Sequence, residues 1–250
     1  MSKLGYQPYI TSIQLLREKI SSFKKYPFNL PVVNNLNQLS IHPQVTYIVG
    51  ENGMGKSTLL EAIAVACGFN PEGGTFNLNF STKETHSELE EFIRIIKSSS
   101  KPKDGFFLRA ESFYNLATEI DNLDKQRGGR RIIDSYGGKS LHEQSHGESF
   151  FAAFMNRFSG EGIYILDEPE AALSPLRQLS MLSRINELVK EDSQFIIATH
   201  SPIVMAYPNS KILELSESGI KETSLEHTQN FQLMSQFFQD KDRLLHHLLS

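Results

Sequence analysis

Short apolar runs recur along the chain, and several end abruptly in glycine, acidic or histidine residues. Four runs are nearly all apolar: residues 47–49, 105–108, 163–166 and 194–198. Such continuous runs are typical of parallel strands that are buried on both faces. Further segments read as strands, the last of them at a sheet edge: residues 9–15, 30–33, 39–42 and 211–215. Residues 75–80 also read as extended.

Between these runs, apolar residues recur at helical spacing. We predict helices at residues 58–67, 81–97, 111–120, 145–158, 175–190 and 229–248. The last helix carries an apolar stripe that we expect to pack on its own domain. Residues 121–140 read as a loop. Strands that alternate with helices predict an α/β fold with a mostly parallel sheet, and the early strands predict a small N-terminal antiparallel layer.

The first buried run leads directly into a glycine-rich segment, GENGMGKS, at residues 50–57. It matches G-x-x-x-x-G-K-[ST], in which backbone N–H groups surround nucleotide phosphates. Lys56 is placed to reach the β/γ oxygens, and the Ser57 hydroxyl suits Mg²⁺. The helix that follows directs its positive end at the phosphates and stops at Gly68. A chance glycine-rich turn is the alternative, and the flanking strand and helix argue against it.

Two later strands end in residues suited to phosphoryl chemistry. The run at 163–166 ends in Asp167 and Glu168, and the run at 194–198 is followed by Thr199 and His200. Ligands of open α/β sheets bind at the carboxyl ends of the strands. We expect Asp167 to bind Mg²⁺ through water, Glu168 to orient and deprotonate an attacking water, and His200 to face the γ-phosphate. The structural alternatives are an acidic turn before Pro169 and a lone structural histidine.

The helix expected at residue 145 starts with the spacing of a capping box, formed by Ser145 and Glu148. Behind it stands a stripe of Phe150, Phe151, Phe154 and Phe158. One interpretation is a well-capped core helix and nothing more. The other is anion binding, because a capped helix start with Gly147 beside it can approach an anion closely.

Composition limits the function classes. The 250 residues suit one α/β domain, and the net charge of −4 argues against a broad cationic surface for nucleic acid. Cys67 stands alone, so an internal disulfide is excluded, which fits a reducing cytoplasm. No apolar signal region and no run of eighteen apolar residues occurs, so we expect a soluble, cytoplasmic protein without direct membrane insertion.

Taken together, these motifs resemble the ATP-binding-cassette (ABC) ATPases, particularly the soluble, non-transporter branch related to the RecF and structural-maintenance-of-chromosomes proteins. Residues 50–57 match the family's Walker A motif, residues 163–168 its Walker B motif with the catalytic glutamate, and His200 its switch histidine. Residues 144–148 stand at the signature motif. The segments 167–175 and 199–202 look especially like small predicted ATPases of that branch. The resemblance spans about residues 9–215 of a single domain, with an insertion at about 81–143.

The resemblance implies ATP and Mg²⁺ as cofactors, with Lys56, Glu168 and His200 as catalytic residues and Ser57 and Asp167 as metal ligands. The nucleotide-binding set implied is Gly50, Glu51, Asn52, Gly53, Met54, Gly55, Lys56, Ser57, Thr58, Ser145, Gly147 and Glu148. It also implies a head-to-tail homodimer. Ser145 and Gly147 of one subunit would touch the γ-phosphate held by the other, and residues 171–174 would form the dimer-contacting D-loop.

The sequence departs from the family at several positions. Gln144 and His146 replace the usual leucine and glycine of the signature, and Ser174 replaces the D-loop aspartate. No clear glutamine loop is visible, and Glu111 is the nearest candidate by position. Tyr26 or Phe28 is a candidate to stack on adenine, although either also suits a core.

Three functions remain open. The first is a Mg²⁺-dependent ATPase working as a homodimer in a DNA- or protein-related process. The second is an ATP-gated switch that binds a protein at 81–143, or DNA through Arg127, Arg130 and Arg131. The third is the energy subunit of a membrane transporter. A GTPase lacks support because no Asn-Lys-x-Asp motif occurs, and too little chain follows His200 for a nuclease domain.

Overall fold

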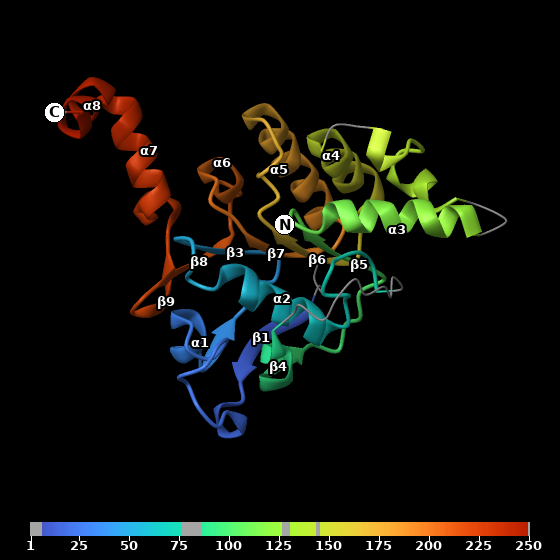
Figure 1. Cartoon of the computed structure of the whole chain (residues 1–250), viewed down its shortest axis with the longest axis horizontal. Coiled ribbons are helices and arrows are strands. Elements are labelled where there is room, and N and C mark those ends of the chain that lie inside the picture. Colours follow the sequence, from blue (N-terminus) through green and yellow to red (C-terminus); the bar gives the residue numbers. More distant parts are fainter. Residues whose placement is uncertain (1–6, 77–86, 127–130, 144–145, 250) are drawn as a thin grey trace.

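A six-stranded sheet divides the molecule into two layers (Figure 1). The computed structural model describes residues 7–76, 87–126, 131–143 and 146–249. The strands run in the order β5 (Asp104–Arg109), β6 (Gly162–Asp167), β7 (Gln194–Ala198), β3 (Val45–Gly50), β8 (Lys211–Ser216) and β9 (Gly219–Thr223). The first five are parallel and β9 is antiparallel to β8. The predicted α/β class with a mostly parallel sheet is confirmed.

A second, three-stranded antiparallel sheet lies beneath the first. Its order is β2 (Gln38–Ser40), β1 (Ile10–Leu15) and β4 (Ile93–Lys97). The predicted antiparallel layer is therefore confirmed, but one of its strands comes from a segment predicted as helix. Residues 88–92 form a short 3₁₀ turn, and residues 93–97 pair with β1. The apolar residues Leu89, Phe92 and Ile93 have helical spacing, but pairing of residues 93–97 with β1 decides the local structure.

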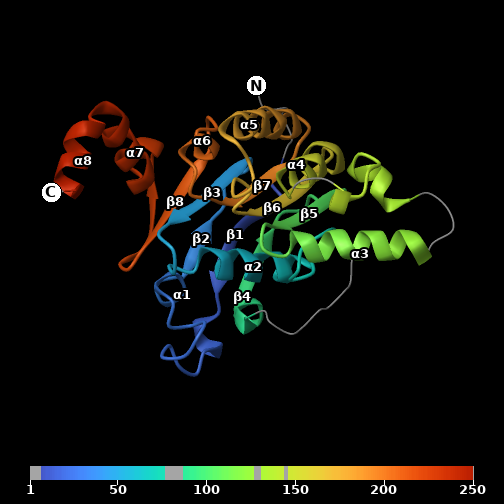
Figure 2. The same ribbon diagram turned by 45° about the horizontal axis from the view of Figure 1, so that its top comes forward.

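Helices cover both faces of the large sheet (Figures 1 and 2). On the upper face in Figure 1 lie α3 (Phe113–Gln126), α4 (His146–Arg157), α5 (Pro175–Lys190) and α6 (Pro202–Met205). The lower face carries α1 (Pro31–Asn34) and α2 (Lys56–Cys67). Short 3₁₀ turns fill the connections: η1 (Arg17–Lys19), η2 (Glu88–Phe92), η3 (Ile132–Tyr136), η4 (Leu141–Glu143) and η5 (Leu225–His227).

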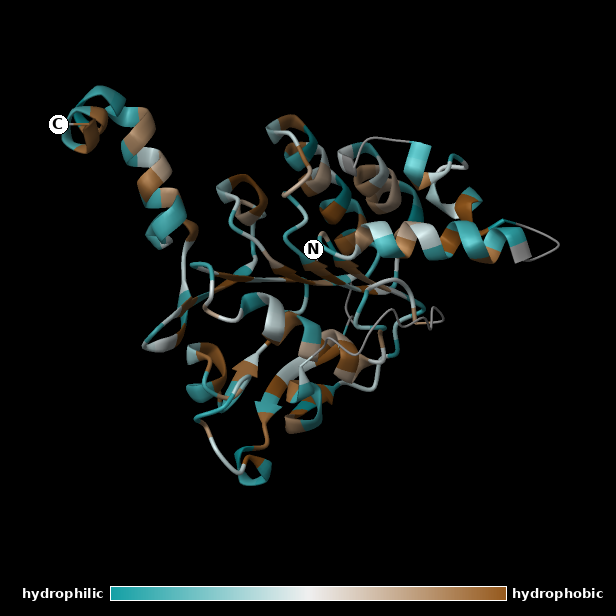
Figure 3. Cartoon of the chain, in the orientation of Figure 1, coloured by the Kyte–Doolittle hydropathy of each residue, from teal (hydrophilic) through white to brown (hydrophobic). Residues whose placement is uncertain are grey.

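Strand alternation builds two separate cores, and Figure 3 shows the apolar colouring concentrated along the sheet. On β6, Tyr164 and Leu166 point to the upper core, whereas Ile163 and Ile165 point to the lower one. The upper core is aromatic, with the Phe158 and Tyr164 rings stacked at 4.3 Å between centroids. Strands that bury both faces need nearly continuous apolar sequence, which is why these strands could be predicted from the sequence.

Three further expectations are corrected. Residues 30–33, expected as a strand, contribute to α1, because Pro31 stands at the first helical position, where its fixed φ and missing N–H are tolerated. The strand at 211–215 is not at an edge, since β9 pairs with it through a turn at residues 217–218. The expected loop at 121–140 contains the end of α3 and the turn η3. Most of the extended segment expected at 75–80 lies outside the described residues.

The C-terminal helix expected at 229–248 is two helices, α7 (Gln229–Gln239) and α8 (Lys241–Leu249), separated at Asp240. We call residues 229–249 the C-terminal arm. The arm extends away from both sheets (Figure 1), and neither helix buries a residue. Phe238 is 74% exposed and Leu248 is 70% exposed. The expectation that its apolar stripe packs on its own domain is therefore wrong.

Candidate nucleotide site

The glycine-rich loop after β3 closes around the amino group of Lys56. Lys56 Nζ donates to the carbonyl oxygens of Gly50 at 2.9 Å and Glu51 at 3.0 Å. Gly50 has φ 142°, and a Cβ there would lie 2.6 Å from the Leu215 carbonyl oxygen on β8. Only glycine fits this crossing of loop and strand. The loop thus holds the buried ammonium group of Lys56 at the start of α2. Both this charge and the N-terminus of the helix favour an anion such as phosphate at this place.

Charge around Lys56 is balanced by acidic residues. Burial lowers the pKa of Lys56, and the carboxylates of Glu168, Asp167 and Glu170 oppose that change. Asp167 is the last residue of β6, the strand that lies two places from β3 in the sheet, and Glu168 and Glu170 follow it. The sequence elements expected to meet at this edge therefore lie within electrostatic reach of one another.

Asp167 ends β6 and is almost fully buried. Its Oδ1 accepts a hydrogen bond from Ser57 Oγ at 3.1 Å. Burial raises its pKa to about 6, with contributions from the neighbouring Glu168 and Glu111, while Arg109 and the Ser57 hydrogen bond act in the opposite direction. A carboxylate held this way gains from a nearby cation.

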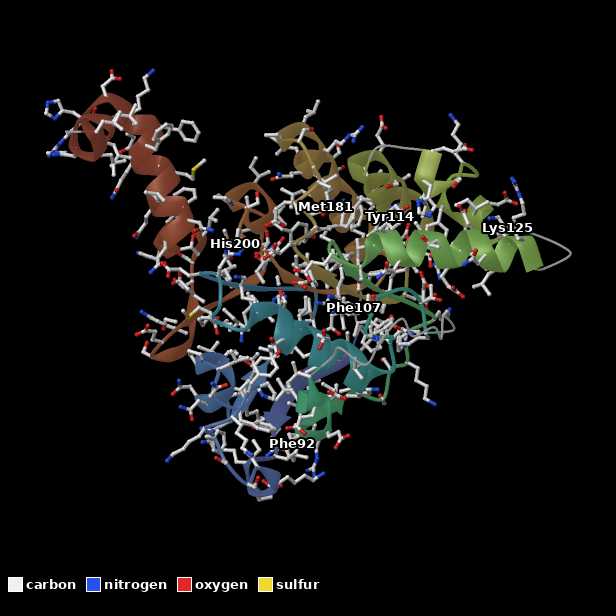
Figure 4. All side chains as sticks on the ribbon, in the orientation of Figure 1. Phe92, Phe107, Tyr114, Lys125, Met181 and His200 are labelled. Atoms are coloured by element: carbon white, nitrogen blue, oxygen red, sulfur yellow. The ribbon has the colours of Figure 1, made fainter. Side chains whose placement is uncertain are left out.

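Glu168 and His200 face one another across the ends of β6 and β7. The distance from Glu168 Oε1 to His200 Nε2 is 3.4 Å. The strand register explains the meeting, because Asp167 pairs with Ala198, so the residues that follow both strands leave the sheet together. Glu168 has a left-handed backbone, φ 50°, and its N–H donates to the Ala198 carbonyl at 3.0 Å. Both side chains are partly exposed, and Figure 4 labels His200 near the base of the C-terminal arm.

Ser57 and Asp167 suit Mg²⁺ by the chemistry of their donors. Both offer hard oxygen atoms, 3.1 Å apart. Mg²⁺ usually takes one or two protein oxygens together with waters and nucleotide phosphates. Within the described part of the chain, no group of three or more His, Cys, Asp or Glu side chains is placed to hold a metal. A sparse pair beside a phosphate cradle is the pattern expected for a metal that arrives with a nucleotide.

The signature segment is described only from residue 146. Ser145 and Gln144 lie outside the described residues. Gly147, in the first turn of α4, packs so closely on Ala172 that a side chain at 147 would collide with the Ala172 carbonyl oxygen. Glu148 is half exposed, with Oε1 3.7 Å from Arg177 Nη2. Gly147 therefore lies beside the 171–174 segment of the same chain, and Glu148 lies beside Arg177 in the first turn of α5.

Arg109 at the end of β5 is a site residue that the sequence analysis missed. Its Nη1 lies 2.6 Å from Glu61 Oε2 on α2, and its Nε lies 3.9 Å from Asp167 Oδ2. Glu111, the positional candidate for the glutamine loop, is 86% exposed, and its Oε2 lies 3.4 Å from Arg109 Nη2. A charged residue ending an apolar run, as in GFFLR, was the available signal.

Glu170 and Asn230 were also missed. Glu170 Oε1 accepts the backbone N–H of His200 at 2.6 Å, and Asn230 Nδ2 donates to the His200 carbonyl at 2.8 Å. Glu170 stands two residues after Glu168 in the acidic segment, which was a visible signal. Asn230 offered none, because it is 30 residues from His200 in the sequence.

The two candidates for adenine stacking are placed differently. Phe28 is buried in the lower core and packs edge-on against Phe92 at 4.8 Å. Tyr26 is 60% exposed, and its hydroxyl lies 3.5 Å from Thr58 Oγ1, just after the glycine-rich loop. Tyr26 is therefore the one whose ring is accessible beside the loop.

The arginines proposed as a DNA contact are only partly described. Arg127 and Arg130 lie outside the described residues. Arg131 is exposed and pairs with Asp134 at 2.9 Å, so its charge is already partly balanced within the chain.

A parallel sheet with a phosphate loop at one strand end and an acidic pair on a nearby strand defines a P-loop NTPase of the ATP-binding-cassette type. The family model described as AAA domain (AAA_23) matches residues 18–245, and the chain belongs to this family. The resemblance to ABC ATPases noted in the sequence is confirmed at the level of the family.

Known proteins similar to this chain are named as ABC transporter family members or as transporter ATP-binding proteins. ABC transporter E family member 1 of Arabidopsis thaliana is 29% identical over 183 residues, which is 66% of this chain and 30% of that protein. The energy-coupling factor transporter ATP-binding protein EcfA2 of Methanospirillum hungatei is 24% identical over 78% of this chain and 51% of its own length. The chain thus spans about a third and about half of these relatives.

Among solved structures, MJ1267, described as an ATP-binding cassette of an ABC transporter, superposes with a TM-score of 0.51. It is 16% identical, with 87% of this chain and 92% of that chain covered. At this identity the likeness supports the fold alone. In the part of the chain that the structure describes, no helix combines the length and apolar character needed to cross a bilayer.

Proposed function

We propose that the chain is a Mg²⁺-dependent ATPase that converts ATP to ADP and phosphate. The observation that carries the proposal is the meeting of Lys56, Ser57, Asp167, Glu168 and His200 at one edge of the sheet. Residues 50–58 would surround the phosphates with backbone N–H groups, and Lys56 would move from the loop carbonyls to the β/γ oxygens. Tyr26 would stack on the base.

In the proposed reaction, Glu168 accepts a proton from a water aligned with the γ-phosphorus. The water oxygen bonds to phosphorus as the bond to the β–γ bridging oxygen breaks, which releases ADP and inorganic phosphate. His200, beside Glu168, would contact the γ-phosphate oxygens and hold the water in line. Mg²⁺, carried by Ser57 and Asp167, would supply charge neutralisation on the phosphates.

The site would be completed by a second copy of the chain. Ser145, Gly147 and Glu148 would approach the γ-phosphate of the partner subunit, and residues 171–174 would line the contact. The packing of Gly147 on Ala172 supports this, because it joins the signature and D-loop segments into one surface. We place the protein in the cytoplasm, where ATP is supplied, as a homodimer in its ATP-bound state.

A transporter energy subunit is a second candidate, because similar proteins carry that name. An ATP-gated switch that binds DNA or protein, with incidental turnover, is the third. Co-purification with a polytopic membrane protein would favour the transporter role. Salt-sensitive DNA binding that requires ATP, measured by fluorescence anisotropy at two salt concentrations, would favour the switch.

Glu168→Gln tests the proposed chemistry. The amide keeps the shape of the side chain but cannot accept the proton, so the hydrolysis rate is expected to fall by roughly 100-fold or more while ATP still binds. Lys56→Ala is expected to weaken ATP binding itself. Glu217→Gln, an exposed acid in the turn between β8 and β9, is the matched control. Phosphate release at the wild-type rate from the Glu168→Gln protein would refute the mechanism.

A further inference from the structure

The backbone of His200 is hydrogen-bonded on both its N–H and its carbonyl by side chains of other segments. Its N–H donates to the Glu170 carboxylate at 2.6 Å, and its carbonyl accepts from the Asn230 amide at 2.8 Å. A hydrogen bond to a carboxylate is among the stronger kinds. One peptide segment is therefore tied both to the acidic segment after β6 and to the C-terminal arm.

The residue after His200 is fixed as well. Ser201 Oγ caps α6 by accepting from Ile203 N and Val204 N, and it donates to Gln178 Oε1 at 2.6 Å. Gln178 in turn donates to the Leu173 carbonyl at 3.0 Å. The support for the His200 loop therefore reaches across to α5 and the 171–174 segment, but its connection to the arm runs through Asn230.

Asn230 sits where the arm is anchored. Thr228, which is 1% exposed, caps α7 by accepting from Phe231 N. Gln229 N donates to Glu214 Oε1 on β8 at 3.2 Å. Beyond this root the arm buries nothing. Residues 228–230 are therefore fixed to the domain beside His200, and they can hold His200 in place independently of the exposed rest of the arm.

We propose that Asn230 and Glu170 are positioning residues. They hold His200 beside Glu168, where its side chain would contact the γ-phosphate. The inference rests on the proposed ATPase function. Neither side chain would touch the nucleotide; each fixes the main chain from which the imidazole projects. It follows that the start of the C-terminal arm is a structural part of the catalytic edge.

Asn230→Asp is the sharpest variant. It is nearly isosteric but replaces the N–H donor with a carboxylate oxygen that repels the His200 carbonyl. Because Asn230 is the second residue of α7, an aspartate there is favoured by the helix dipole, so the helix should still form. Gln232→Glu, on an exposed position of the same helix, is the matched control. Melting curves verify that both proteins fold.

Displacing His200 should affect ligands with a γ-phosphate and spare ADP. For Asn230→Asp, we expect kcat to fall about tenfold or more, as misplacement of a reacting group does. The Kd of a non-hydrolysable ATP analogue should rise about tenfold, since a bond to a charged group is lost. The Kd of ADP should change less than about twofold, a split that general loosening would not produce.

Coupling to His200 is checked in a double variant. In a His200→Ala background, Asn230→Asp should have no further effect on kcat, because the group it positions is gone. Glu170→Ala should resemble Asn230→Asp, and Glu170→Gln, which keeps an oxygen acceptor, should recover most of the rate.

The two proposals fail in different ways. If wild-type protein hydrolyses ATP and loses activity on Glu168→Gln, yet Asn230→Asp behaves like Gln232→Glu, the positioning role is wrong and the ATPase stands. Equal weakening of ADP and ATP-analogue binding would also overturn the positioning role. If wild-type protein neither binds nor hydrolyses ATP, both proposals fall.

Discussion

At the scale of single residues, Arg109 makes several charge contacts near the site. It lies among three carboxylates, those of Glu61, Glu111 and Asp167. Arg109 and Glu61 are largely buried, with side chains 17% and 10% exposed. A buried pair of this kind contributes little net stability, yet removal of one partner leaves the other charge without compensation. Arg109 also opposes the rise in the pKa of Asp167.

Arg109→Met is therefore expected to lower the free energy of unfolding by about 3 kcal/mol, the scale for a broken buried pair. The double variant Arg109→Met/Glu61→Gln should recover most of that loss, because no unpaired carboxylate remains at position 61. Glutamine also retains the oxygen that accepts the Ser87 N–H. Urea titrations of the two proteins measure the difference in unfolding free energy. Equal values would show that the unpaired Glu61 carboxylate is not the cause of the loss.

At the scale of elements, β7 joins the two sheets through one side chain. Gln194 is fully buried, accepts from Ile10 N at 2.9 Å and donates to the Ile10 carbonyl at 2.8 Å. It also donates to the His42 carbonyl at 3.0 Å. The amide thus pairs with β1 as a neighbouring strand would, which ties the antiparallel layer to the amino end of β7, an interior strand of the large sheet.

Gln194→Leu should cost about 3 kcal/mol of unfolding free energy, since the buried N–H and carbonyl of Ile10 and the partly buried His42 carbonyl all lose this partner, and a buried backbone group without a partner costs about 1–3 kcal/mol. Denaturant unfolding gives the value. Gln38→Leu is the comparison, because Gln38 is exposed and its amide donates to a side chain, the Ser12 hydroxyl at 3.1 Å, and not to a backbone group. Similar losses in both variants would contradict the bridging role.

At the scale of the whole molecule, the phosphate loop and the 146–148 segment are expected to act in different copies. The first follows β3 near the middle of the sheet, whereas α4 begins beside the 171–174 segment. A composite site needs both surfaces to face a partner, and hydrolysis would then separate the two copies. Blocked hydrolysis should trap the closed pair.

The Glu168→Gln protein with Mg-ATP is therefore expected to run at twice the monomer mass by light scattering, and at the monomer mass without nucleotide. Lys56→Ala serves as the control that remains monomeric in both conditions, because it cannot hold the nucleotide. A Glu168→Gln protein that stays monomeric with saturating ATP would contradict the composite site. A constant dimer in every condition would place the contact elsewhere, with the exposed apolar face of the C-terminal arm as the first region to examine.

The sequence by itself determined the phosphate loop, the acidic pair and the central strands. Each is a local pattern: glycines at positions of positive φ, continuous apolar runs and polar residues directly after them. The helix predicted at 175–190 and the strand at 194–198 match their observed bounds for the same reason.

Tertiary structure decided what depends on partners distant in the chain. Residues 93–97 became a strand because β1 was available to pair with them, and β8 became internal because β9 folded back on it. The contacts of Arg109 with Glu61, of Gln194 with Ile10 and of Asn230 with His200 join segments 30 to 184 residues apart. Periodicity reports the environment of one segment, and only packing specifies which segment meets it.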